Sequence, residues 1–145
     1  MYKHILIPTD GSPLSEDAVK QGLALAKTLN AKVTAVTVTP PFHVFAADPA
    51  MVTDTREQYE KDAAAMGHRR LRFARDAASV AVVACDVVHT VAEHPYAAII
   101  DAATARGCDL IVMASHGRKG FTGLVLGSET LKVLTHSKIP TLVTR

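Results

Sequence analysis

The sequence predicts an α/β fold in which one parallel sheet is flanked by helices. Apolar, strand-like runs alternate with segments whose apolar residues recur at three- and four-residue intervals, a pattern typical of parallel strands joined by right-handed helical crossovers. The chain has 145 residues, of which 48% are hydrophobic, which suits one domain with a substantial core. No linker, repeat or low-complexity tract divides it, so we predict a single domain over residues 1–145.

The predicted strands lie at about 4–8, 32–39, 86–91, 109–114 and 141–144. We expect an open, doubly wound sheet of five parallel strands in the order 3-2-1-4-5, a Rossmann-like arrangement. In such a sheet, ligands bind outside the carboxyl ends of the strands, near the point where the strand order reverses.

The first helix is predicted to begin with Ser12 as N-cap and Pro13 in its first position, and to stop at Asn30. The residues on its inner face are Val19, Leu23, Ala26 and Leu29.

The second helix is predicted over roughly 54–79, with a charged outer face. Its inner residues are Tyr59, Ala63, Met66, Phe73 and Ala77. An interior glycine costs about 1 kcal/mol relative to alanine, so a break at Gly67 stays open. A third helix follows Pro95, and a fourth runs over about 128–136. The residues predicted to face inward from these two helices are Ala98, Ile99, Ala102, Leu131 and Leu134.

The connection over residues 40–53 is long and unusually apolar. It leaves the carboxyl end of a predicted strand, where a ligand would sit. Two interpretations remain open for it, a lid over the ligand and a surface loop.

Composition limits the classes of function. The formal net charge of +2 is too small to demand a polyanionic partner, and the two cysteines form no metal or redox motif. We expect Cys85 and Cys108 to be reduced and largely buried. No apolar run reaches the roughly 18 residues of a membrane helix, and residues 1–5 lack a signal-peptide layout. We therefore expect a cytoplasmic protein without a membrane partner.

Four of the eight glycines fall within residues 117–127, directly after the strand-like run 109–113. Glycine lets backbone N–H groups approach a ligand, and a helix beginning at Gly127-Ser128 would add its free N–H groups and the positive end of its dipole. The pattern therefore predicts a phosphate cradle, with an ordinary mobile connection as the alternative. Neither G-x-x-x-x-G-K-[ST] nor G-x-G-x-x-G is present.

The spacing is instead Ala114, Gly117, nine residues, then Gly127-Ser128. In this the chain resembles the universal stress protein family, whose nucleotide-binding members carry G-x-x-G, nine residues, then G-[ST]. The opening residues 5–12 and the closing residues 139–144 match as well, so the resemblance spans essentially the whole chain. It departs at Ala114, which replaces the first motif glycine.

Chemistry and resemblance together suggest roles for single residues. Asp10 offers a carboxylate to ribose hydroxyls, a base edge or Mg²⁺, and Val38 offers backbone groups and an apolar wall to adenine. By resemblance, both positions match family sites that contact ATP. An Asx-type turn or helix cap is the alternative for Asp10, as an N-cap is for Ser128. For Glu129 we assign only the backbone N–H to phosphate, since its carboxylate would repel the ligand.

Arg118 and Lys119 could neutralise phosphate charge or remain solvated. His116 has no partner for catalysis and is expected to shape the loop. The scattered histidines show no metal-ligand spacing, so we predict no side-chain metal site. The basic run at 68–75 is interpreted as a solvated helix face, which makes nucleic acid an unlikely partner.

The residues predicted to contact the nucleotide are Pro8, Thr9, Asp10, Val38, Met113, Ala114, Ser115, His116, Gly117, Arg118, Lys119, Gly120, Gly127, Ser128 and Glu129. The resemblance implies a cytoplasmic stress-response protein that binds ATP with Mg²⁺ and forms a homodimer through the last strand, 141–144. We expect a nucleotide-dependent switch acting on an unknown protein partner. A nucleotide-free dimeric interaction module and a slow ATPase are the alternatives.

Overall fold

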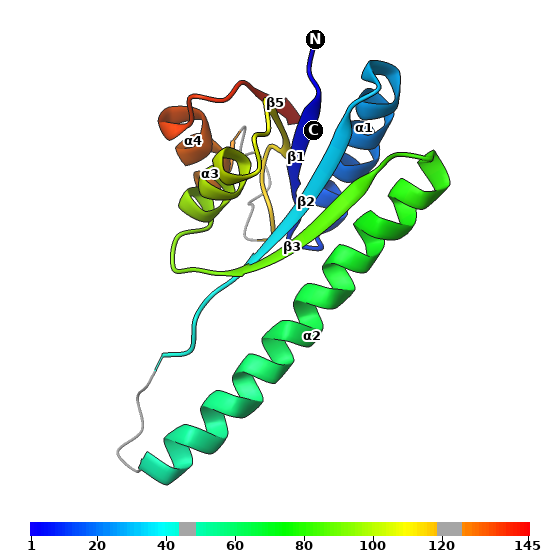
Figure 1. Cartoon of the computed structure of the whole chain (residues 1–145). Coiled ribbons are helices and arrows are strands. Elements are labelled where there is room, and N and C mark those ends of the chain that lie inside the picture. Colours follow the sequence, from blue (N-terminus) through cyan, green and yellow to red (C-terminus); the bar gives the residue numbers. More distant parts are fainter. Residues whose placement is uncertain (44–48, 119–125) are drawn as a thin grey trace.

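The computed structural model describes residues 1–43, 49–118 and 126–145. Its centre is a five-stranded sheet in the order β3-β2-β1-β4-β5, with every neighbouring pair parallel (Figure 1). This confirms the predicted strand order. The strands are β1 (His4–Pro8), β2 (Lys32–Thr39), β3 (Cys85–Val91), β4 (Leu110–Ala114) and β5 (Thr141–Thr144).

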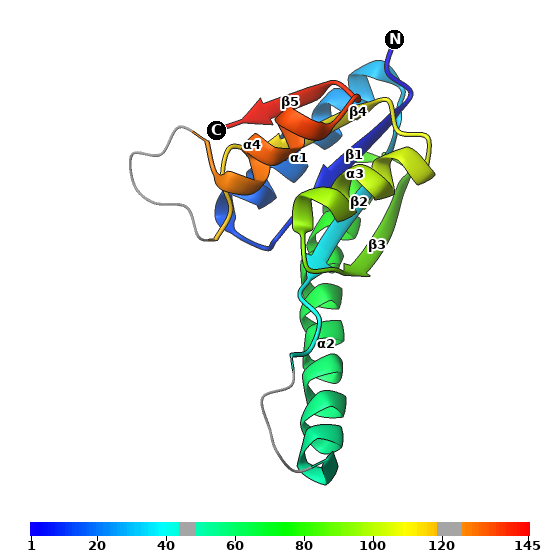
Figure 2. The same cartoon turned by 90° about the vertical axis from the view of Figure 1, so that its left-hand side faces the viewer.

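Two helices cover each face of the sheet. Helices α1 (Pro13–Leu29) and α2 (Pro49–Ala81) lie on one face, and α3 (Pro95–Ala105) and α4 (Ser128–His136) lie on the other (Figures 1 and 2). The chain is therefore doubly wound, as predicted. Because β1 leads to a helix on one face and β4 to a helix on the other, the strand order reverses between these two central strands.

Alternate strand residues feed two separate cores. Ile5, Ile7 and Val33 are buried against α1 and α2, whereas Leu6 and Ile111 are buried against α3 and α4. Burial of one such side chain stabilises the fold by about 1.5–3 kcal/mol. Near-continuous apolar runs in the central strands are thus explained by burial on both faces.

Helix α1 begins and ends as the sequence indicates. The Ser12 hydroxyl accepts a hydrogen bond from the Ser15 N–H at 3.3 Å, and Pro13 occupies the first helical position. Asn30 ends the helix in the left-handed conformation, with φ 52°.

Helix α2 is longer than predicted. It begins at Pro49 rather than at about residue 54, and it runs unbroken past Gly67 to Ala81. Proline suits the first turn of a helix, because its missing N–H has no intrahelical partner there. The His89 ring lies 3.0 Å from the point where a Cβ on residue 67 would project, so this glycine makes room for a neighbouring strand. The N-terminal part of α2 extends beyond the sheet (Figures 1 and 2).

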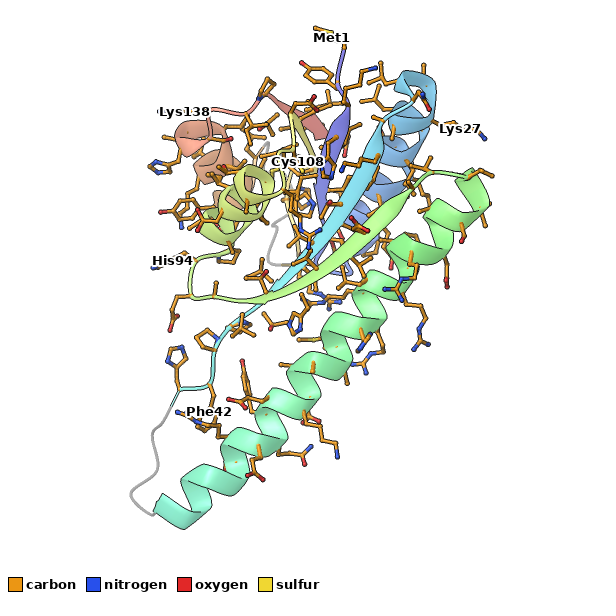
Figure 3. All side chains as sticks on the ribbon, viewed as in Figure 1. Met1, Lys27, Phe42, His94, Cys108 and Lys138 are labelled. Carbon is orange, nitrogen blue, oxygen red and sulfur yellow. The ribbon has the colours of Figure 1, made fainter. Side chains whose placement is uncertain are left out.

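The connection before α2 is correspondingly shorter, 40–48, and residues 44–48 lie outside the described residues. Its described part rests on α2. The Tyr59 hydroxyl donates to the Pro40 carbonyl at 2.8 Å, and the rings of Phe42 and Tyr59 are 5.6 Å apart (Figure 3). The lid role of this segment stays a prediction.

Helix α4 presents a different face to the sheet from the one predicted. Leu131 and Leu134, expected inside, are 54% and 41% exposed, and Thr130 and Val133 are buried in their place. The Thr130 hydroxyl donates to the Ala114 carbonyl at 2.9 Å, and this hydrogen bond fixes which side of the short helix faces β4.

Both cysteines are free thiols, as expected. Cys108 is buried, whereas Cys85 is only partly so. Burial raises the pKa of Cys108 to about 11. In the described part of the chain, no helix combines the length and the apolar character needed to cross a membrane.

Candidate functional site

The turn after β1 forms one side of the candidate site. The buried Thr9 donates its N–H to the Val36 carbonyl at 2.8 Å, and its hydroxyl bonds the Ser15 hydroxyl at 3.0 Å. Gly11 follows with a φ of 76°, a left-handed conformation that favours glycine. The turn is thus anchored to both the sheet and the start of α1.

Asp10 joins this turn to the loop after β4. Its Oδ1 accepts from the Ser12 N–H at 2.9 Å, and its Oδ2 accepts from the Arg118 N–H at 2.8 Å. Burial by itself would raise the pKa of Asp10, but hydrogen bonds from Ser12 and Arg118 outweigh it and lower the pKa below the ordinary 3.8. The carboxylate is therefore ionised at neutral pH. The hydrogen bond from Ser12 forms the Asx-type turn. The hydrogen bond from Arg118 links the same carboxylate to the loop after β4.

Gly117 is required by the position of Asp10. A Cβ on residue 117 would collide with the Asp10 carboxylate, and the Arg118 Nε donates to the Asp10 carbonyl at 2.7 Å. Close packing against Asp10 is therefore what excludes a larger residue at position 117, and the contact of Gly117 with a nucleotide stays a prediction.

The base of the glycine-rich loop is closed by its own backbone. The Gly127 N–H donates to the Ser115 carbonyl at 2.6 Å. A Cβ on Gly127 would lie 2.9 Å from His116 Cβ and 3.0 Å from its Cα, closer than real Cβ atoms approach. His116 also places its Nδ1 3.3 Å from the Ser115 hydroxyl. These contacts agree with a loop-shaping role for His116.

The N-terminus of α4 opens at this loop. Gly127 occupies the N-cap position and supplies no side-chain hydrogen bond, and the exposed Ser128 is the first helical residue. Ser128 is therefore not the N-cap, which corrects that alternative. The first-turn N–H groups of α4 and the positive end of its dipole have the chemistry that suits an anion.

Glu129 turns its carboxylate away from this end. Its Oε2 accepts from the Tyr96 N–H at 2.8 Å, where α3 begins, and its Oε1 lies 3.4 Å from Lys132 Nζ. The repulsion expected from a carboxylate beside phosphate is thereby reduced. The Glu129 N–H stays in the first turn of α4.

The other predicted residues surround this centre. Pro8 ends β1, and Met113 and Ala114 end β4, both buried. Val38 is partly buried against the α3 side of the sheet. The β1–β2 register pairs Pro8 with Val36, so its continuation brings Val38 level with Asp10. Lys119 and Gly120 lie outside the described residues.

One basic residue at this site was missed by the sequence analysis. Arg70 of α2 was placed in the solvated basic run, but its Nε is buried and its Cγ lies 3.0 Å from an ideal Cβ on Gly11. Arg69 and Arg72 are exposed, as predicted. The sequence pattern could have indicated this position. Arg70 follows the buried Ala63 and Gly67 at four- and three-residue intervals, which places the three residues on one face of a helix.

Two hollows lie elsewhere. One of about 570 Å³ lies between β3 and α3, and one of about 440 Å³ lies between α2 and β3. None of the predicted site residues lines either hollow. Residues 119–125 of the loop after β4 lie outside the described part of the chain. The candidate site is therefore defined by the described residues at the two ends of this loop and by the turn after β1.

Comparison with known proteins shows the family to which the chain belongs. The family model described as the universal stress protein family matches residues 1–145. The chain belongs to the universal stress protein family. Universal stress protein MJ0531 of Methanocaldococcus jannaschii is 30% identical, over all of this chain and 83% of that protein. YxiE, a family member from Bacillus subtilis, is 26% identical over the full length of both chains.

Solved structures share the fold, and some carry nucleotides. MJ0577, described as a hypothetical protein, has a TM-score of 0.84 at 24% identity, covering 99% of this chain and 96% of that one. A universal stress protein in complex with cAMP has a TM-score of 0.73 at 27% identity, covering 99% and 97%. The Archaeoglobus fulgidus protein in complex with dAMP, at 15% identity and TM-score 0.69 over 99% and 98%, shares the fold alone.

Proposed function

We propose that this universal stress protein binds ATP at the carboxyl edge of the sheet, between β1 and β4, and acts as a nucleotide-dependent switch. The observation that carries the proposal is the N-terminus of α4. Its N-cap is Gly127, which has no side chain to accept hydrogen bonds from the first N–H groups of the helix. The Glu129 carboxylate accepts a hydrogen bond from α3 instead. Peptide N–H groups and a positive dipole end are therefore left for an anion.

The surrounding residues fit the rest of an adenine nucleotide. The ionised Asp10 can accept hydrogen bonds from ribose hydroxyls, and Val38 offers an apolar wall one strand away. Gly117 packs against Asp10 and Gly127 packs against His116, so neither position has room for a side chain. A universal stress protein that is 27% identical to this chain is in complex with cAMP, which supports the choice of an adenine nucleotide. Mg²⁺ would enter with the phosphates, which bind it with most of its water retained.

A switch follows from the two roles of Asp10. The carboxylate accepts a hydrogen bond from the Arg118 N–H, so a ribose that shares this carboxylate would alter the position of Arg118. The loop after β4, to which Arg118 belongs, leads into α4, whose outer face is exposed to solution. A protein partner that reads this surface would sense nucleotide occupancy in a cytoplasmic stress response.

The homodimer is proposed through β5, the outermost strand beside β4. An edge strand presents unpaired backbone groups. Leu142 on β5 is 46% exposed, and Leu131 and Leu134 on the neighbouring α4 are also exposed. A second copy of the chain would cover these leucines while its β5 continues the sheet.

A matched pair of variants at Ser128 tests the nucleotide site. Ser128→Glu adds a negative charge at the first position of α4, which suits the helix dipole but repels phosphate. Ser128→Gln has nearly the same shape and no charge. By calorimetry we expect ATP affinity to fall roughly tenfold or more in the first variant relative to the second. Thermal unfolding without ligand should show Ser128→Glu to be at least as stable.

Equal ATP affinity in the two variants would show that the phosphates do not bind at the N-terminus of α4. Absence of ATP binding by the unmodified protein would favour the nucleotide-free interaction module. Nucleotide identified by mass spectrometry in the purified protein would show which adenine nucleotide the site prefers.

A further inference from the structure

Arg70 and Arg118 meet at the Gly11 turn, although they come from α2 and from the loop after β4. An ideal Cβ on Gly11 would lie 3.0 Å from Arg70 Cγ and 3.0 Å from Arg118 Nη2. Both arginine side chains therefore occupy the space beside the same turn. The left-handed φ of Gly11 and this crowding together demand glycine there.

Arg70 is fixed in place but weakly paired. Its Nε is buried and has no hydrogen-bond partner among the described residues. Its Nη1 lies 3.4 Å from Thr37 Oγ1 and its Nη2 lies 3.4 Å from Met66 Sδ, and the first of these is beyond the usual range of a strong hydrogen bond. Among the side chains that the structure describes, Arg70 forms no ion pair with a carboxylate.

Positive charge exceeds negative charge at this point. Asp10 is the nearby carboxylate, and its two oxygens already accept from the Ser12 and Arg118 N–H groups. Burial and the charge of Arg118 lower the pKa of Arg70, and Asp10 opposes them only in part. A partly desolvated cation without a counter-ion is unfavourable. An anion held by both guanidinium groups would relieve this.

We infer that Arg70 and Arg118 form a phosphate-binding pair that takes the distal phosphate of a bound nucleotide. Guanidinium groups suit phosphate because their planar N–H forks donate two hydrogen bonds at once. In this form the inference rests on the proposed function. It adds a contact from α2, so the pair discriminates nucleotides by the number of their phosphates and links occupancy to the long helix.

Calorimetry with ATP, ADP and AMP tests the pair. The variants are Arg70→Gln and the exposed Arg118→Gln, with Arg72→Gln as the control, an exposed arginine on the same helix. We expect Arg70→Gln to weaken ATP binding roughly tenfold or more and AMP binding much less. Arg118→Gln should show the same selectivity, and Arg72→Gln should bind all three as the unmodified protein does.

A second measurement separates nucleotide phosphate from free phosphate. Inorganic phosphate is titrated into ¹⁵N-labelled protein while the amide signals of Gly11 and Arg118 are followed. Loss of phosphate-dependent shifts in Arg70→Gln, with nucleotide affinities unchanged, would support the pair with free phosphate as its ligand. This titration still decides on the pair if the unmodified protein does not bind ATP and the proposed function fails.

Three results would overturn the inference. One is unchanged ATP and phosphate binding in Arg70→Gln. Another is an equal loss for ATP, ADP and AMP without a change in phosphate binding, because the three nucleotides share only base, ribose and first phosphate. The third is a loss in Arg72→Gln as large as in Arg70→Gln. Ligand-free Arg70→Gln should unfold at the same temperature as the unmodified protein or higher, because it removes an uncompensated cation.

Discussion

The carboxylate of Asp10 lies directly against the Cα of Gly117, with no room for a Cβ between them. This contact brings the end of β1 and the loop after β4 together at the point where the strand order reverses. The next residue, Arg118, donates its N–H to the same carboxylate. A glycine that sequence spacing assigned to a phosphate cradle therefore also has a role inside the protein.

Gly117→Ala is predicted to destabilise the protein by about 1–3 kcal/mol, because the added methyl group must displace the Asp10 carboxylate. Asp10→Ala removes that obstacle. In the Asp10→Ala background, the same Gly117→Ala change should be neutral or stabilising by about 0.4–1 kcal/mol, through the lower entropy of the unfolded chain. Chemical denaturation of the four proteins of this double-mutant cycle measures the coupling. A cost of Gly117→Ala that is the same in both backgrounds would show that Asp10 is not its cause.

The buried His4 and the half-buried His89 predict a pH dependence of stability. Burial is the largest cause that lowers the pKa of His89 and of His4 below the ordinary 6.5. As the pH falls below 6.5, the unfolded chain binds protons that the folded chain does not, so the free energy of unfolding falls. Well above that pH, both histidines are neutral in both states and contribute no slope.

The melting temperature should therefore decrease between pH 7 and pH 5. His89→Gln retains a side chain able to bond Thr39, which lies 2.7 Å from His89 Nε2, but it does not titrate. Its melting temperature should fall less steeply over the same range. An identical slope in the variant would assign the pH dependence to other groups.

Local signals in the sequence predicted much of the fold. Apolar runs located the strands, and Ser12-Pro13 and Asn30 marked the ends of α1 because capping depends on the residues themselves. The start of α2 was missed because Pro49 was interpreted as part of a connection, although proline also suits a first helical turn.

Tertiary contacts explain the other errors. Leu131 and Leu134 are apolar, yet the hydrogen bond from Thr130 to Ala114 sets which face of α4 is buried. Arg70 was missed at the site because its position depends on the packing of α2 against the sheet, which brings it to Gly11 from a distant part of the chain. Glycine spacing singled out Gly117 and Gly127, which the structure shows to be closely packed, and their part in a phosphate cradle stays a prediction.

The dimer prediction rests on the outward backbone groups of β5. Ser115 and Ile111 of the β4 segment donate their N–H groups to the carbonyls of Thr144 and Pro140. Because the N–H and C=O of one strand residue point to the same side, Thr144 faces β4 and Val143 faces the open edge. Val143→Pro therefore removes a donor from the edge and leaves the bonds to β4.

Sedimentation should show a dimer for the unmodified chain and a monomer for Val143→Pro at tens of micromolar. Leu142→Lys provides an independent variant, because it places a charge on the exposed apolar surface without changing the backbone. A monomeric unmodified protein would contradict the proposed assembly. A dimer that persists in both variants would show that the two copies associate through another surface.

Turnover of ATP is predicted to be very slow, well below the typical enzyme rate of about 10 per second. Phosphoryl transfer requires a nucleophile oriented in line by a base or a water-positioning group. Asp10 is unsuited to this task, because both its oxygens accept backbone N–H groups and its lowered pKa makes it a weak base. His116 contacts the Ser115 hydroxyl and lies close to Gly127, which fits the predicted loop-shaping role better than a catalytic one. In a phosphate-release assay with Mg²⁺ and saturating ATP, we expect binding without appreciable turnover. Release of several phosphates per second, abolished by Asp10→Ala or His116→Ala, would show that the protein is an ATPase and would contradict the proposed switch.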